Sequence, residues 1–379
     1  MKVLHIITGL EHGGAESALF RLITYQNNAV EQIVVSMMSM GIYGERLEAA
    51  GIKVFALNMS RGTVSFSGLF KLWRIIRKNK PDIIQTWMYH ADLIGGIDAR
   101  FAGCTNIAWS IHNFNIDKGV ATNSTRWTAK MCALVSGWVP KKIISCSARS
   151  AVVHQKIGYS QEKFVVIPLG YDLEKCKRNE IARRNIRSSW NIDPHGIVLG
   201  CVARWDPYKD HKNLLTAFAK VSSEWPWVYC VLVGPGMDKD NKELADLIKK
   251  SGAKADQIIL MGSSEDIPAV MSAIDLHILS SLGEAFPNVV CEAMACGTPC
   301  IVTDVGDASV IVGQTGWVVP PADSEALASA MLLALNGMTE ATAWKKRSAD
   351  CRKHILDNFS MKRMFDTYYD TWKTMLSNP

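Results

Sequence analysis

The chain has 379 residues, which is enough for two domains that each bury a full core. Hydrophobic residues make up 48% of it, an ordinary fraction for a globular protein, and no apolar run reaches the roughly 18–20 residues of a membrane-spanning helix. The net charge of +6 is uneven, because residues 1–170 carry 19 basic and 10 acidic residues whereas the remainder carries 23 and 26, so an anionic partner is expected on the first half.

The segment at the start of the chain, MKVLHIITGLEHGG, lacks a basic stretch followed by a long apolar core. We therefore expect a core strand there rather than a signal peptide. The ten cysteines show no C-x-x-C pair, and no spacing of cysteines and histidines supports a zinc site, so we expect no metal. Most cysteines lie in apolar contexts and are expected to be buried and reduced, which predicts a cytoplasmic protein.

The first 170 residues alternate between apolar runs and amphipathic stretches, a pattern that predicts a parallel, doubly wound sheet. The expected strands are 2–8, 32–36, 53–57, 83–86, 106–111, 142–145 and 164–167. The expected helices are 13–25, 45–50, 67–78, 90–101 and 125–136. Ligands of such sheets bind at the carboxyl ends of the strands.

Two glycines follow the first expected strand and open a helix. Gly13 and Gly14 allow a ligand to approach the backbone closely, and a helix start favours anions. Their spacing does not fit the dinucleotide fingerprint G-x-G-x-x-G. Glu16 either belongs to this site or merely favours the positive end of the helix. His112 ends the strand 106–111, at the same edge of the sheet, and is either a ligand contact or a structural histidine.

Residues 171–196 are highly charged and poor in strand formers, which predicts a linker with one short helix. A second α/β domain is expected over 197–358, and a final helix, 361–379, could cross back to the first domain. Its expected strands are 197–203, 228–233, 257–260, 275–279 and 300–303, and its expected helices are 211–222, 243–251, 267–273, 286–296, 324–335 and 340–358. Arg204 and Lys209 lie in the loop after the strand 197–203, where a planar guanidinium and a mobile ammonium could neutralise a diphosphate. They could equally be solvated loop cations.

The stretch 280–306, SSLGEAFPNVVCEAMACGTPCIVTDVG, predicts a loop, a helix, a turn and a buried strand. The helix starts near Phe286, Pro287, Asn288 and Val289, and its backbone N–H groups and dipole suit a phosphate. Glu292 lies near that end and could accept hydrogen bonds from two ribose hydroxyls. Glu284 precedes the helix and could face what lies beyond the phosphate. Alternatively, both glutamates only favour the helix dipole.

The glutamate pair within AFPNVVCEAMACGTPCIVTDVG, the arginine–lysine spacing and the GGAE segment resemble the signature of family-four retaining glycosyltransferases. The resemblance implies an α/β chain of the GT-B fold, with two Rossmann-like doubly wound domains facing across a cleft. It implies transfer of a hexose-type sugar from a nucleotide diphosphate sugar, with a UDP-sugar favoured, without metal or cofactor. His112 would contact the transferred sugar, and Gly13, Gly14 and Glu16 would face the acceptor and the diphosphate.

The acceptor implied by the resemblance is a saccharide, in particular a lipid-diphosphate-linked one of bacterial surface polysaccharide synthesis, and no nucleic acid is expected. A soluble acceptor, a nucleotide-sugar epimerase or phosphorylase of the same fold, and a non-catalytic nucleotide-sugar-binding protein remain open. Residues 71–78 and 127–142 combine bases with tryptophans, which suits either an anionic membrane surface on the cytoplasmic side or a solvated helix face.

Overall fold

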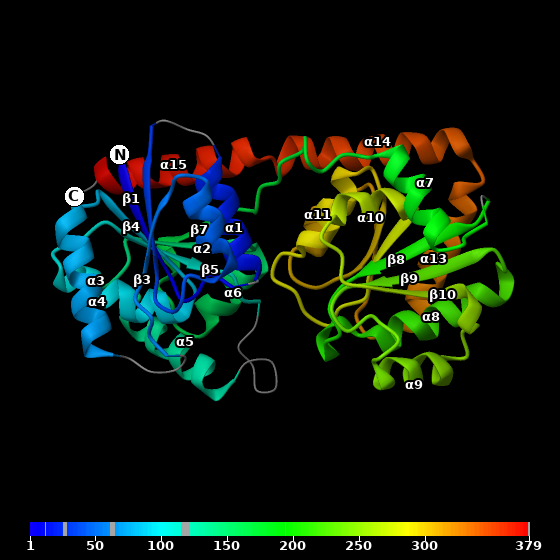
Figure 1. The fold of residues 1–379 in the computed structure, drawn as a ribbon, viewed down its shortest axis with the longest axis horizontal. Coiled ribbons are helices and arrows are strands. Elements are labelled where there is room, and N and C mark those ends of the chain that lie inside the picture. Colours follow the sequence, from blue (N-terminus) through cyan, green and yellow to red (C-terminus); the bar gives the residue numbers. More distant parts are fainter. Residues whose placement is uncertain (12, 26–28, 61–64, 115–121, 194, 378–379) are drawn as a thin grey trace. The chain divides into compact units, whose positions relative to one another are not determined.

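The structure, a computed structural model, describes all residues except 12, 26–28, 61–64, 115–121, 194 and 378–379. The chain forms two compact units (Figure 1). Met1–Gly170 and Met361–Pro379 make up the first unit, and Tyr171–Ser360 makes up the second. No helix in the described part of the chain is both long enough and apolar enough to span a bilayer.

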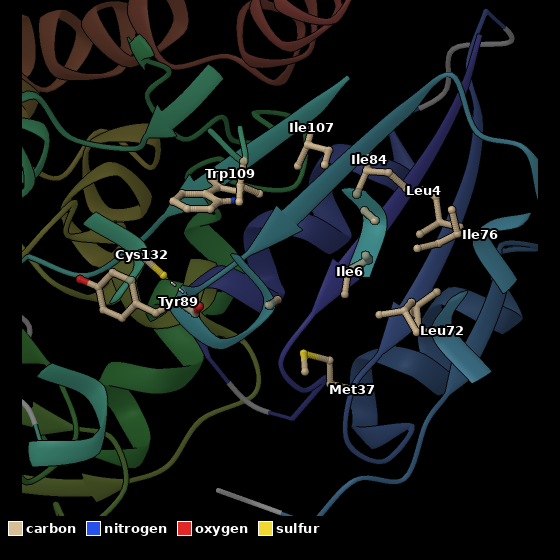
Figure 2. Close-up of a cluster of buried hydrophobic side chains, with 14 of the residues drawn as sticks. Leu4, Ile6, Met37, Leu72, Ile76, Ile84, Tyr89, Ile107, Trp109 and Cys132 are labelled. Carbon is tan, nitrogen blue, oxygen red and sulfur yellow. Dashed lines mark hydrogen bonds between the residues drawn. The ribbon is translucent and has the colours of Figure 1, made fainter. Parts of the chain in front are cut away.

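The first unit contains a seven-stranded sheet in the order β3-β2-β1-β4-β5-β6-β7, in which every described pairing is parallel. Its strands are β1 (Lys2–Ile7), β2 (Glu31–Ser36), β3 (Lys53–Ala56), β4 (Ile83–Trp87), β5 (Ile107–Ile111), β6 (Lys142–Ser145) and β7 (Phe164–Val166). The central strands β1, β4 and β5 are mostly apolar and are buried along almost their whole length, as parallel strands covered on both faces require. Figure 2 shows part of this core, with Leu4, Ile6, Ile84 and Trp109 among its side chains.

Seven α-helices accompany this sheet in the described part of the unit. They are α1 (Gly14–Thr24), α2 (Gly41–Ala49), α3 (Phe66–Asn79), α4 (Gly96–Phe101), α5 (Asn123–Val135), α6 (Ala148–Lys156) and α15 (Met361–Ser377). Helix α6 was not expected from the sequence. The expected helix 90–101 begins as one π-helical segment, Ala91–Gly95, in which the buried Asp92 accepts a hydrogen bond of 2.5 Å from Thr86 Oγ1. Burial raises the pKa of Asp92 far above its ordinary value.

The last helix, α15, packs into the first unit although it is distant in sequence. The indole of Trp372 is fully buried, and its Nε1 donates a hydrogen bond of 3.0 Å to Oε1 of Gln85 on β4. Gln85 Nε2 in turn donates to Ser110 Oγ at 2.8 Å. Helix α15 thus supplies both apolar surface and a hydrogen-bond donor to the middle of the sheet.

The second unit contains a six-stranded parallel sheet in the order β10-β9-β8-β11-β12-β13. Its strands are β8 (Ile197–Val202), β9 (Val228–Val233), β10 (Ile258–Gly262), β11 (Leu276–Leu279), β12 (Cys300–Thr303) and β13 (Trp317–Val319). Its α-helices are α7 (Glu180–Ser189), α8 (His211–Glu224), α9 (Lys242–Ser251), α10 (Ile267–Ala273), α11 (Asn288–Ala295), α12 (Ala308–Val312), α13 (Ser324–Met338) and α14 (Ala341–Asn358). Neither α12 nor β13 was expected.

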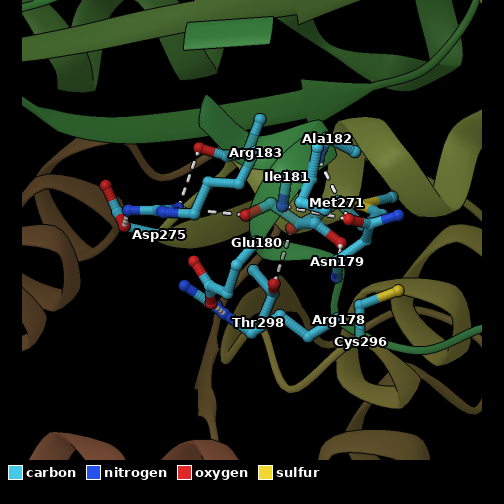
Figure 3. Close-up of polar contacts among 12 residues, drawn as sticks. Arg178, Asn179, Glu180, Ile181, Ala182, Arg183, Met271, Asp275, Cys296 and Thr298 are labelled. Atoms are coloured by element: carbon cyan, nitrogen blue, oxygen red, sulfur yellow. Dashed lines mark hydrogen bonds and ion pairs between the residues drawn. The ribbon is translucent and has the colours of Figure 1, made fainter. Parts of the chain in front are cut away.

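The segment 171–196, expected as a linker, is incorporated into the second unit. Helix α7 packs on α10, and its Arg183 forms an ion pair of 2.5 Å with Asp275 (Figure 3). Arg187 of the same helix forms a second ion pair with Asp275, at 2.9 Å. All three side chains are largely buried. Two of the charges of this segment therefore serve a buried contact, a distinction that composition alone does not make.

We expect Trp372→Phe to lower the free energy of unfolding of the first unit by about 1–3 kcal/mol. The substitution keeps an aromatic ring but removes the N–H group, so Gln85 Oε1 loses a donor in a buried position. Urea unfolding followed by far-ultraviolet circular dichroism measures the change. Trp227→Phe, at a side chain that is 50% exposed, is the control, and equal stability of both variants would contradict the role of this contact.

Candidate active site

The loop between β11 and α11 carries most of the residues expected to bind a phosphate. Helix α11 begins at Asn288 after Pro287, whose side chain makes no capping hydrogen bond. Its first amides therefore point out of the helix at the positive end of the dipole. Gly306 lies against the loop at φ +51°, and a Cβ there would collide with the carbonyl oxygens of Glu284 and Ala285. A glycine at this position lets the two backbones approach, which fixes the path of the loop.

An ion pair joins two of the predicted residues. Lys209 Nζ lies 2.5 Å from Glu284 Oε1, and the two side chains are only 20% and 13% exposed. The hydroxyl of Ser281 donates to the same carboxylate oxygen at 2.7 Å, and Ser280 Oγ donates to the Lys209 carbonyl at 2.7 Å. The loop after β8 and the loop after β11 are thereby held together at the carboxyl edge of the sheet.

Arg204 lies in the same loop as Lys209 but has a different partner. Its Nε and Nη2 donate to Asp206 Oδ2 at 3.0 and 2.8 Å, and its side chain is 66% exposed. Asp206 also accepts a hydrogen bond of 2.9 Å from the Tyr208 amide, so the acid orders the loop and the guanidinium at once. Asp206 was not predicted from the sequence. A carboxylate two residues after an arginine is too common to indicate a site.

The start of α11 is tied to Tyr171, which lies 117 residues away in sequence. The Tyr171 hydroxyl donates to Asn288 Oδ1, and the tyrosine is only 2% exposed. Phe286 is buried, with its ring centroid 5.7 Å from that of Phe359 in an edge-on contact. Glu292 is half-buried one turn further along the helix. Tyr171 was missed because no local pattern links positions so far apart.

In the first unit, Gly13, Gly14 and Glu16 form the start of α1, as expected. The carboxylate of Glu16 folds back over Gly13 so closely that a Cβ at Gly13 would overlap it. Burial raises the pKa of Glu16. The acid thus occupies the positive end of its own helix, while also lining the cavity described next.

A cavity of about 750 Å³ opens at the carboxyl edge of the first sheet. Residues that follow the first five strands line it: Thr8, Met38, Met59, Met88 and Asn113. Glu16 and the buried Tyr89 also contribute, and Tyr89 Oη lies 2.5 Å from His154 Nε2. The lining combines adaptable thioether side chains with a few polar groups, a composition that suits an organic ligand carrying hydroxyl groups.

His112 follows β5 and precedes Asn113 of the cavity. Its imidazole stacks on Trp87, with ring centroids 5.2 Å apart and an interplanar angle of 18°. Its Nε2 is buried, and no described residue hydrogen-bonds to it. Burial, assisted by the charge of Arg21, lowers the pKa of His112 to about 4. A neutral imidazole can exchange hydrogen bonds with a hydroxyl without the cost of a buried charge.

The predicted residues therefore form two groups, one in each unit. Glu16 and His112 lie at the carboxyl edge of the first sheet. Arg204, Lys209, Glu284 and the start of α11 lie at the same edge of the second sheet. Among the described residues, no group of three His, Cys, Asp or Glu side chains could hold a metal ion.

Two family models match the chain, one described as "Glycosyltransferase Family 4" over residues 12–175 and one as "Glycosyl transferases group 1" over residues 196–336. An Escherichia coli protein named UDP-Gal:alpha-D-GlcNAc-diphosphoundecaprenol alpha-1,3-galactosyltransferase is 25% identical over 330 residues, covering 82% of this chain and 80% of the relative. A Campylobacter jejuni protein named N,N'-diacetylbacillosaminyl-diphospho-undecaprenol alpha-1,3-N-acetylgalactosaminyltransferase is 26% identical over 315 residues, covering 78% and 79%.

A solved structure of Anabaena HepE in complex with UDP is similar in fold, with a TM-score of 0.85. The two chains are 22% identical, and the match covers 99% of this chain and 100% of HepE. Together with the two parallel sheets, this likeness confirms the predicted GT-B fold.

We expect the His112 ring to stay neutral between pH 8 and pH 5.5, because burial places its pKa near 4. Nuclear magnetic resonance of labelled histidine rings measures this, with the His112 signals assigned by their loss in His112→Asn. The exposed His195 serves as the internal comparison. A midpoint near the ordinary value, about 6.5, would contradict the buried environment described for His112.

Proposed function

The chain belongs to the family-four glycosyltransferases, and from this membership we propose that it transfers a hexose-type sugar from a nucleoside diphosphate donor to a saccharide, with retention of the anomeric configuration. The observation that carries this proposal is the Lys209–Glu284 pair beside the start of α11. A cation and a helix N-terminus can bind a phosphate, and a carboxylate beside them can accept hydrogen bonds from a sugar attached to that phosphate.

The proposed donor contacts divide the nucleotide sugar among these groups. The diphosphate lies at the amides of Asn288 and Val289, with Arg204 and Lys209 supplying positive charge. Glu292 accepts hydrogen bonds from the ribose hydroxyls, and Glu284 accepts them from the transferred sugar. A UDP-sugar is the favoured donor, because the E. coli relative is named for UDP-Gal and HepE was solved with UDP.

In the proposed reaction the bond from the anomeric carbon to the phosphate oxygen breaks, and a bond to the acceptor hydroxyl oxygen forms on the same face. The acceptor proton passes to the departing diphosphate. Arg204, Lys209 and the dipole of α11 stabilise the negative charge that grows on the diphosphate, the task that a metal performs in other transferases. We therefore propose that no divalent metal is required.

The proposed acceptor is a lipid-diphosphate-linked saccharide of bacterial surface polysaccharide synthesis. The names of the two bacterial relatives both contain a diphosphate-linked undecaprenol. In this chain the cavity in the first unit is the proposed acceptor site, lined by Glu16 of the helix start that Gly13 and Gly14 open, and by Asn113, which follows His112. The methionines adapt to an extended, partly apolar substrate, and Glu16 orients its hydroxyl groups.

The first unit also carries a surface that fits an anionic membrane. Large apolar side chains of α3, α4 and α5 and of the turn after α5 are strongly exposed. Together with the nearby bases Arg74, Arg77, Lys78 and Arg100, they form what we call the aromatic basic surface. The apolar side chains are Phe66 (90%), Phe70 (60%), Phe101 (75%), Trp127 (62%), Leu134 (77%) and Trp138 (55%). Side chains of this kind are usually buried or in contact with a partner when they cluster.

Ring contacts order the side chains within α3, and hydrogen bonds connect α3 to the end of α4 and α4 to the turn after α5. On α3, the Arg74 guanidinium lies 5.9 Å from the Phe70 ring centroid, and Arg77 lies 5.8 Å from that of Trp73. Arg100 of α4 donates to the carbonyls of Trp138 and Val139 at 2.7 and 2.9 Å, which places α4 beside the end of α5. Aromatic rings flanked by arginine suit the headgroup region of a bilayer. We propose peripheral attachment to the cytoplasmic face, where a lipid-linked acceptor is available.

Transfer from UDP-glucose and UDP-galactose to a synthetic lipid-diphosphate saccharide tests the proposed activity. Arg204→Ala and Lys209→Ala should each lower the rate by about 10²–10³, because each removes charge stabilisation from the leaving group. Lys212→Ala, an exposed base on the adjacent helix α8, is the matched control. The rate should persist in EDTA. Near-normal rates in both variants, or loss in EDTA that added metal reverses, would overturn this mechanism.

Sedimentation with vesicles tests the aromatic basic surface. The protein should bind vesicles containing phosphatidylglycerol at low salt and detach as salt rises, since each base near such a surface contributes on the order of 1 kcal/mol. Phe66→Ser with Phe70→Ser, and separately Arg74→Glu with Lys78→Glu, should weaken binding while UDP affinity is kept. Lys249→Glu with Lys250→Glu, on α9 of the second unit, is the matched charge reversal. If all these variants bind the vesicles as well as the wild type, the aromatic basic surface is not the membrane-binding site.

A further inference from the structure

The hydroxyl of Tyr171 is the part of the second unit whose role the proposed donor contacts leave unexplained. Tyr171 is 2% exposed, yet its hydroxyl is not simply buried: it donates to the side-chain oxygen of Asn288, the first residue of α11. Asn288 is where the phosphate is proposed to bind. A tyrosine that fixes this side chain acts on the donor site without touching the donor.

The backbone of Tyr171 is itself fixed. Its amide donates to the Phe359 carbonyl at 2.9 Å, and Tyr171 forms a parallel β-bridge with Ser360. Phe359 also contacts the ring of Phe286, two residues before Asn288. The amide bond to Phe359 is part of this bridge, so the tyrosine hydroxyl is presented to the start of α11 from a backbone held by a β-bridge, which limits the positions that Asn288 can adopt.

The direction of this hydrogen bond decides which end of the amide faces the ligand. When Oδ1 of Asn288 accepts from Tyr171, the end of the amide that is turned away from the tyrosine is the N–H₂ group, which is a donor. A donor next to the positive end of a helix suits a phosphate oxygen, whereas the carbonyl end of the amide would repel it. Rotation of the side chain by half a turn would reverse this preference.

We propose that Tyr171 is a positioning residue of the donor site, which holds the Asn288 amide with its N–H₂ group toward the phosphate. This inference rests on the proposed function, because it assumes that a nucleoside diphosphate binds at α11. We expect Tyr171 to affect UDP binding more than uridine binding, because the Tyr171 hydroxyl donates to Asn288 at the proposed phosphate site. A tyrosine that merely stabilised the fold would affect all ligands and the melting temperature together.

Calorimetry of the full chain with UDP, and competition by uridine, tests the proposal. Tyr171→Phe should weaken UDP binding by roughly three- to tenfold, the range expected for loss of one hydrogen bond, while uridine affinity stays the same. Asn288→Ala should weaken UDP binding to a similar or larger extent. The double variant Tyr171→Phe with Asn288→Ala should bind UDP no more weakly than Asn288→Ala, because the tyrosine acts through the asparagine.

Asn288→Asp tests the direction of the amide without altering the tyrosine. The aspartate keeps an oxygen for Tyr171 but replaces the N–H₂ group with a second oxygen, so UDP affinity should fall at least tenfold while the melting temperature is kept. If Tyr171→Phe does not fold, Asn288→Asp still tests whether the N–H₂ group of Asn288 faces the phosphate. Tyr229→Phe, on β9 of the same unit, is the matched control and should bind UDP like the wild type.

The outcomes separate this proposal from the proposed function. If the wild type binds neither UDP nor another nucleoside diphosphate, both the proposed donor site and the positioning role of Tyr171 are wrong. If the wild type binds UDP but Tyr171→Phe binds it equally well, or loses UDP and uridine affinity in parallel, the positioning role is overturned and the donor site stands. Additive losses in the double variant, or undiminished UDP binding by Asn288→Asp, overturn it as well.

Discussion

The ion pair between Lys209 and Glu284 connects the two loops on which the second unit's site depends. These loops follow β8 and β11, strands that pair directly, so the carboxyl ends of both strands lie at one edge. Two largely buried charges lose much of their hydration, and their attraction repays this only where the surrounding hydrogen bonds are good. Ser280 and Ser281 supply such bonds, and Thr303 Oγ1 donates to the Ser281 carbonyl at 2.6 Å. The site is thus ordered before any ligand arrives, which is the condition under which charged groups stabilise a transition state most.

The two units use different physical means to prepare for a ligand. The second unit holds its charged groups in a network of short loops and a helix start. The first unit instead surrounds its cavity with Met38, Met59 and Met88, flexible side chains that can repack. Fixed groups suit a substrate part that is the same in every donor, such as a diphosphate. Adaptable groups suit a part that varies in shape, such as an oligosaccharide.

Much of the fold was predictable from sequence, because buried parallel strands are continuous apolar runs with a clear boundary at each end. Strands β6, β9 and β12 were predicted with their observed bounds, and helix α10 likewise. The π-helical segment Ala91–Gly95 was not, since a single turn of five residues leaves no periodicity to detect. Helix α7 was predicted only as part of a linker, because the ion pairs of Arg183 and Arg187 with Asp275 span about 90 residues of sequence.

The candidate site was predictable one residue at a time but not as a set of partners. Lys209 and Glu284 each follow a strand, so their location at the edge of the sheet followed from topology. Their direct contact did not, nor did the pairing of Arg204 with Asp206, because both depend on side-chain directions within loops. Tyr171 was inaccessible to sequence reasoning for the same reason.

The return of α15 to the first unit has a consequence for synthesis on the ribosome. The sheet of this unit is translated within the first 170 residues, yet the helix that supplies Trp372 emerges only after the 190 residues of Tyr171–Ser360. At about 5–20 residues per second, the nascent first unit waits roughly 10–40 seconds with Gln85 and the surrounding apolar surface uncovered. During that interval a chaperone has a defined surface to protect, and the second unit can fold completely before the first is closed.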